Sequence, residues 1–126
     1  MSADTVRRAL TALADDLDGD RAAAARFARS WLGLLPARVD GLVTAQRAGD
    51  AGSARAVLLT LGCTSRMLGV DELAAESARA LATLDEAGRV TEPDVRAVVA
   101  HTRRARDLVR AVLDRDERVQ SRGSNR

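Results

Sequence analysis

RAAAARFARSWLGLLPARVDGLVTAQRA, residues 21–48, decides the fold class of this chain. Its apolar residues recur every three or four positions, which is the spacing of one face of an α-helix. The recurring residues are Phe27, Trp31, Leu34, Leu35, Val39, Leu42, Val43 and Ala45. Pro36 should bend this helix or divide it, because proline lacks a backbone N–H and crowds the preceding turn. We expect this segment to be the longest element of the chain.

Helical spacing also predicts four other helices, over residues 3–17, 50–68, 71–86 and from 91 onward. Turn residues separate them. The separating residues are Asp18-Gly19-Asp20, Gly49-Asp50, Gly69 and Gly88. Asp50 or Ser53 can cap the third helix, and Thr91-Glu92-Pro93-Asp94 is typical of a capping box that opens the last one.

The composition agrees with an all-α domain. Of 126 residues, 46% are hydrophobic and 30% charged, whereas only 2% are aromatic, so strand-forming residues are scarce. Short links between amphipathic helices favour antiparallel neighbours. We therefore predict an up-down-up-down four-helix bundle with an additional short N-terminal helix. One domain should cover residues 1–119, followed by a flexible tail over 120–126, and no apolar run is long enough for a membrane helix.

Charge gives little support to a nucleic-acid partner. The net charge is +2, and all 20 basic residues are arginine. Residues 1–95 carry a net charge of −3 and residues 96–126 one of +5, so the positive end is the last helix and the tail. Phe27 and Trp31, the two aromatic residues, lie on an apolar helix face and are not spaced for stacking on bases. The N-terminus lacks the apolar core of a signal peptide and Cys63 has no cysteine to pair with, so we expect a cytoplasmic protein that binds neither nucleic acid nor membrane.

The helix over residues 50–68 carries the candidate site. Its inward face should hold Leu58 and Leu61, with Val57 also buried. The residues left facing outward are Arg55, Leu59, Gly62, Cys63 and Arg66. Glycine is unfavourable inside a helix, so Gly62 has either of two explanations: a surface kept low for a partner to approach, or tight packing against a neighbouring helix.

From about Phe27 to Leu113 the chain resembles the histidine-containing phosphotransfer (HPt) domains of bacterial phosphorelays. In that family an ordered set of short motifs surrounds an Ala-His-x-Leu-Lys-Gly stretch that holds the phosphoacceptor histidine. The matching pieces here are Trp31-Leu32, Leu35-Pro36, Gly49-Asp50, Leu58 to Cys63, Leu68-Gly69-Val70, Leu73-Ala74 and Leu84-Asp85. The resemblance implies a helical bundle that binds a response-regulator receiver domain or a histidine kinase.

The chain departs from the family at the reacting position. Leu59 stands where the family has its phosphoacceptor histidine, and Gly62 stands where it has a lysine. Leucine offers no lone pair to a phosphoryl group, so we expect a pseudo-phosphotransfer protein that is not an enzyme and needs no metal or cofactor. Leu59 should then be exposed and part of a partner-binding surface with Arg55, Gly62, Cys63 and Arg66.

Two other functions stay open from the sequence. The chain can be a structural helical module that acts as an adaptor or as a homodimer burying Leu59. It can also be a working phosphotransfer protein that uses His101, the single histidine. His101 lies in the last helix, where the apolar stripe should leave it at the boundary of the core beside Arg104.

Overall fold

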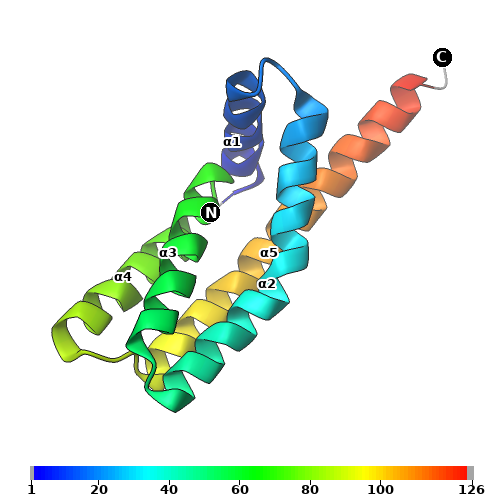
Figure 1. The fold of residues 1–126 in the computed structure, drawn as a ribbon. Coiled ribbons are helices and arrows are strands. Elements are labelled where there is room, and N and C mark those ends of the chain that lie inside the picture. Colours follow the sequence, from blue (N-terminus) through cyan, green and yellow to red (C-terminus); the bar gives the residue numbers. More distant parts are fainter. Residues whose placement is uncertain (1, 125–126) are drawn as a thin grey trace.

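The computed structural model describes residues 2–124, with side chains through Gln120, and contains five helices in that range. They are α1 (Ala3–Asp16), α2 (Arg21–Ala48), α3 (Ala51–Met67), α4 (Asp71–Ala87) and α5 (Glu92–Ser124). Figure 1 shows α2 to α5 as an antiparallel bundle, in which each helix packs on the next and α5 closes against α2. The short α1 packs on α2 and α5 at one end. The expected all-α bundle with an additional N-terminal helix is confirmed.

The core is aliphatic around one indole. Trp31 is 2% exposed, and its Nε1 donates to Thr64 Oγ1 at 3.1 Å, which joins α2 to α3. The other large and fully buried side chains are Leu35, Leu42, Leu58, Leu61, Leu68, Leu73, Leu84, Val6, Val70, Val98 and Val109. Burial of such side chains is the main favourable contribution to folding.

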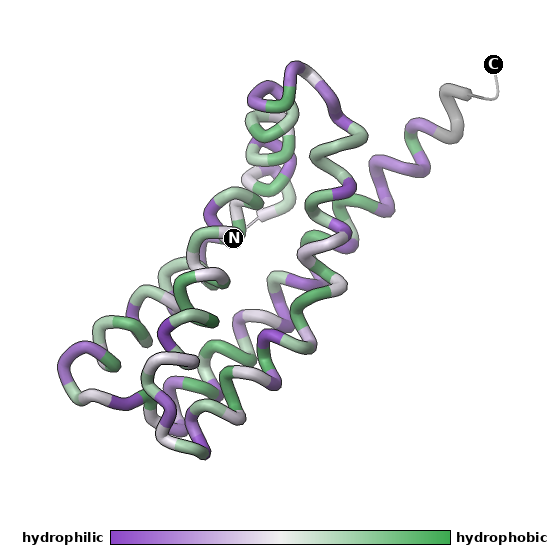
Figure 2. The backbone as a smooth tube through the Cα atoms, viewed as in Figure 1, coloured by the Kyte–Doolittle hydropathy of each residue, from purple (hydrophilic) through white to green (hydrophobic). Residues whose placement is uncertain are grey.

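Of the two outcomes expected at Pro36, the structure has the bend: α2 runs unbroken over 28 residues, and Figure 1 shows its axis changing direction about halfway. The expected longest element does need correction. The longest helix is α5, with 33 residues, and it continues through Ser124 into the segment we expected as a tail; residues 125–126 lie outside the described part. Up to Gln120, Figure 2 colours the end of α5 mostly hydrophilic, so no apolar stripe marks it as helix in the sequence.

The predicted helix ends are confirmed at several turns. The Asp50 carboxylate accepts from the Ser53 backbone N–H at 3.1 Å and caps α3, and these bonds to Ser53 hold the pKa of Asp50 below its ordinary value. Gly69 follows α3 with φ +70°, where a Cβ would lie 2.6 Å from the Thr5 carbonyl oxygen of α1. Only glycine combines that conformation with such a close approach, so Gly69 fixes where α1 meets the bundle.

Candidate functional site

Leu59 lies in the middle of α3 with its side chain directed out of the bundle. The side chain is 49% exposed, whereas Leu58 and Leu61 are completely buried. These three residues confirm the expected register of α3, because a shift by one residue would have turned Leu59 into the core. Val57, which we expected to be buried, is only partly buried, since it lies at the edge of the contact with α2.

Leu59 belongs to a larger apolar surface on the same helix face. Ala56, Cys63 and Met67 are also exposed and lie within about two turns of it. We call Ala56, Leu59, Cys63 and Met67 the α3 patch. Cys63 is a free, exposed thiol. Exposed apolar side chains that are contiguous, unlike scattered ones, are typical of surfaces that bind a partner.

The two predicted arginines of this surface differ in their contacts. Arg55 reaches across to α4, where its Nη2 lies 2.5 Å from Asp85 Oδ1. Arg66 is exposed and forms no ion pair with the described residues. An exposed ion pair stabilises a protein little, so Arg55 can still exchange Asp85 for a partner's carboxylate. Arg66 is available without any exchange.

Gly62 does not belong to the exposed surface, which corrects our assignment of it as a partner-binding residue. It is buried where α3 packs on α4, and a Cβ at this position would lie 3.7 Å from Ser77 Cβ. Of the two explanations that the sequence left open, burial excludes the exposed low surface. The 3.7 Å separation is ordinary van der Waals contact, so the packing of α3 on α4 has room for a Cβ and does not require glycine here. A glycine has no side chain whose polarity could have shown which face it occupies, so the sequence did not decide between them.

His101 lies at the boundary of the core beside Arg104, as expected, between α4 and α5. Its side chain is 23% exposed, and Nδ1 is 3.1 Å from the Arg104 guanidinium. Two carboxylates of α4 flank the ring. Glu76 Oε2 lies 3.8 Å from Nε2, and Glu72 Oε2 lies 3.9 Å from Nδ1. A phosphoryl group approaching Nε2 would meet the Glu76 carboxylate, which opposes the approach of an anion, and Nδ1 is already bonded to Arg104.

The contacts of His101 continue into a network that fastens α4 to the start of α5. Glu76 also binds Arg79, and this bond raises the pKa of the Arg79 guanidinium. Arg79 Nη1 reaches Asp94 at 3.5 Å, and the buried Asp94 accepts from the Thr91 hydroxyl at 2.8 Å in the predicted capping box. Sequence reasoning missed this network, because its members are spread over two helices and meet only through their packing. Its charges satisfy one another within the chain.

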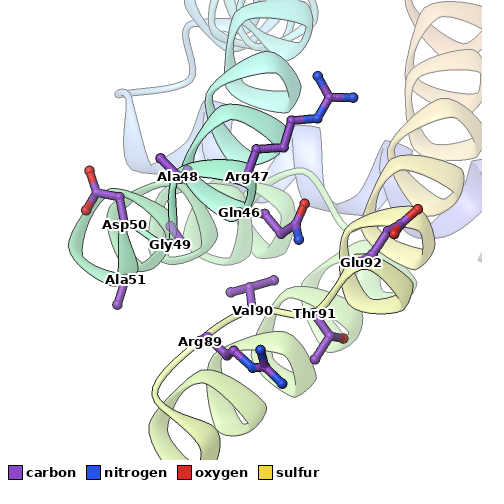
Figure 3. A pocket seen from close by; sticks show the side chains of 12 residues that line it. Gln46, Arg47, Ala48, Gly49, Asp50, Ala51, Arg89, Val90, Thr91 and Glu92 are labelled. Carbon is purple, nitrogen blue, oxygen red and sulfur yellow. The ribbon is translucent and has the colours of Figure 1, made fainter.

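A hollow of about 450 Å³ lies at one end of the bundle, between the α2–α3 turn and the α4–α5 link. Figure 3 shows Val90 and Gln46 near its centre and the Arg47 guanidinium extending away from them. Arg47 and Arg89 are balanced in the lining by Asp50 and Glu92. A second hollow, of about 310 Å³, lies between α1, α2 and the end of α5, where Arg29 binds Glu117. The first lining is balanced, and the second, with Arg7, Arg21 and Arg29 against Asp116 and Glu117, exceeds balance by a single positive charge, so neither has a strong field that would select an ion.

Within residues 2–124 no group of three or more histidine, cysteine, aspartate or glutamate side chains is arranged to hold a metal ion. Across the same residues, no helix combines the length and the apolar character that crossing a membrane needs. Comparison of the chain with protein-family models, curated proteins and solved structures gave no match.

Proposed function

We propose that this protein is a pseudo-phosphotransfer module, which binds a response-regulator receiver domain or a histidine kinase through the α3 patch without accepting phosphate. One observation carries the proposal: Leu59 is half exposed on α3, over the buried Leu58 and Leu61. The sequence resemblance assigns Leu59 to the position at which HPt domains hold their phosphoacceptor histidine. The motif order around it supports the same function.

The chemistry of α3 supports binding and excludes transfer through this position. Leu59 has no lone pair with which to attack a phosphoryl group, and Gly62 has no cation to hold the phosphoryl oxygens. The exposed part of Leu59 does favour contact with an apolar partner surface, since covering a leucine side chain contributes on the order of 1 kcal/mol. Loss of the histidine therefore removes the reaction and leaves an apolar centre suited to docking.

The two alternatives predict different results with the same protein. Transfer through His101 requires a phosphoryl group to pass Glu72 and Glu76, which flank the ring nitrogens. A homodimer that buries the α3 patch would need no receiver or kinase, and its mass would depend on concentration.

Binding to a panel of receiver domains and histidine kinases from the same organism tests the proposal. We expect the wild type to bind at least one member, and Leu59→Arg to weaken that binding by at least about tenfold, because a charge at the centre of an apolar contact loses its water. Leu17→Arg is the matched control, since Leu17 is 40% exposed and lies at the end of α1, away from α3. The control should bind like the wild type.

Three results would contradict the proposal. Acid-labile phosphate on the wild type that disappears in His101→Ala would indicate a working phosphotransfer protein. Concentration-dependent dimerisation that Leu59→Arg abolishes, without binding to the panel, would indicate the structural homodimer. Equal loss of binding in the Leu59 and Leu17 variants would show that the α3 patch has no special role.

A further inference from the structure

Arg38, in the second half of α2, has a guanidinium that forms no ion pair within the described part of the chain. Its residue is partly buried, and its Nη1 is covered by protein atoms but has no hydrogen-bond partner. The other arginines near α3 differ, because Arg55 is paired with Asp85 and Arg66 is exposed.

Two contacts place Arg38 at the seam between α2 and α3. Trp31 Nε1 meets Thr64 Oγ1 at 3.1 Å, and a Cβ on Gly41 would lie 3.6 Å from Val57 Cγ2. These contacts set the antiparallel register of the two helices. Arg38 falls between Trp31 and Gly41 on the same face of α2, one turn after Leu34.

Leu34 gives this part of the seam an exposed apolar side chain. It is 47% exposed, nearly as much as Leu59. By the same register it lies opposite the turn of α3 between Thr60 and Thr64. On the surface of α3 the exposed residues Ala56, Thr60 and Cys63 lie between this seam and Leu59.

An unpaired guanidinium that is partly removed from water makes the free protein less stable than an apolar side chain of similar size would. The cost disappears when a carboxylate binds the charge. Arginine is suited to this role at a protein interface, because its planar group can donate two parallel hydrogen bonds to one carboxylate and its stem adds apolar contact. Arginines of this kind, beside exposed apolar residues, are frequent among the side chains that dominate binding.

We infer that the docking surface crosses α3 and continues onto α2, where the partner places a carboxylate on the Arg38 guanidinium and an apolar side chain beside Leu34. This inference rests on the proposed function, since it concerns the same partner. It adds a residue and a requirement that neither the sequence nor the α3 patch contains: the receiver domain or kinase must present an acidic residue next to its apolar contact.

Arg38→Met removes the charge and keeps an apolar stem, so it separates the effect of the charge on the stability of the free protein from its effect on partner binding. In the free protein this change should raise the thermal unfolding midpoint by about 3–6 °C. Binding to the panel member that the wild type binds most tightly should weaken by at least about tenfold, and Arg38→Lys should fall between the two. Arg47→Met is the matched control. Arg47 is exposed in the last turn of α2, has no ion pair among the described residues, and lies nine residues after Arg38. The control should change neither quantity.

The outcomes distinguish this inference from the proposed function. If Arg38→Met leaves binding unchanged while Leu59→Arg abolishes it, the proposed function stands and the role of Arg38 is wrong. If Arg38→Met lowers the unfolding midpoint, the charge is balanced within the chain and the inference is also wrong. If no panel member binds the wild type, both proposals fail together.

Discussion

The outer face of α3 leaves apolar side chains exposed, whereas the contact between α4 and α5 pairs its charged groups within the chain. Around His101 the charged groups bind one another, from Glu72 and Glu76 through Arg79 to Asp94. On α3, Leu59 and Met67 remain 49% and 43% exposed, and no side chain of the described structure covers them further. A network that is satisfied within the chain needs no partner, whereas exposed apolar side chains gain free energy when a partner covers them. The comparison favours α3 as the binding surface and α4–α5 as a structural contact.

The largest expected effect tests the face assignment within α3 itself. Leu58→Ala or Leu61→Ala should lower the free energy of unfolding by about 2–5 kcal/mol, because each leaves a cavity in a packed core. Leu59→Ala should cost less than about 1 kcal/mol, since the side chain is half exposed. Chemical denaturation of the three variants measures the difference. Equal losses would contradict the separation of α3 into a core face and a binding face.

Removing the buried end of the α4–α5 network should have the next largest effect. Asp94→Ala takes away the hydrogen-bond acceptor of Thr91 at the start of α5 and a contact of Arg79. We expect a loss of about 1–3 kcal/mol of stability, because a helix cap and a buried charge contact are lost together. Receiver or kinase binding, measured on the folded protein, should not change. Weaker binding at equal folding would mean that the network contributes to the interface.

The sequence predicted those parts of the fold that depend on local signals. Helix ends at Asp50, Gly69 and Thr91 follow from the chemistry of caps and left-handed turns, and the exposure of Leu59 follows from the apolar spacing around it. The role of Gly62, the α4–α5 network and the unpaired Arg38 depend on how helices are rotated against each other. Rotation is set by the packing of many side chains at once, and no short stretch of sequence records it.

Gly62→Ala should change the stability of the protein by a smaller amount, and the buried position of Gly62 determines whether the change is a gain or a loss. A Cβ at Gly62 makes only ordinary contact, 3.7 Å from Ser77 Cβ, so Gly62→Ala should stabilise the protein by about 0.5–1 kcal/mol through better helix propensity. Gly69→Ala is the matched control and should destabilise it, since its φ is +70° and its Cβ would lie 2.6 Å from the Thr5 carbonyl oxygen. Binding to the partner should survive Gly62→Ala, because this residue is buried in the contact between α3 and α4. If Gly62→Ala weakened binding without loss of stability, Gly62 would belong to the surface after all.

The smallest effect is expected at His101. Its contacts with Glu72 and Glu76 are 3.9 and 3.8 Å long, and its hydrogen bond with Arg104 is to a residue one turn away on the same helix. Contacts of this kind at a partly exposed site contribute little, so His101→Ala should lower stability by less than about 1 kcal/mol. Binding to a receiver domain or kinase should stay within about twofold of the wild type, because the ring lies between α4 and α5 and is not part of the α3 patch. The measurement that matters is paired: unfolding midpoint and dissociation constant for His101→Ala beside Leu59→Ala. Both variants should alter stability only slightly, whereas only Leu59→Ala should weaken binding by more than about twofold. If His101→Ala instead reduced binding more than Leu59→Ala did, the partner would have to engage the α4–α5 face, and the division between a satisfied contact and an exposed binding surface would be overturned.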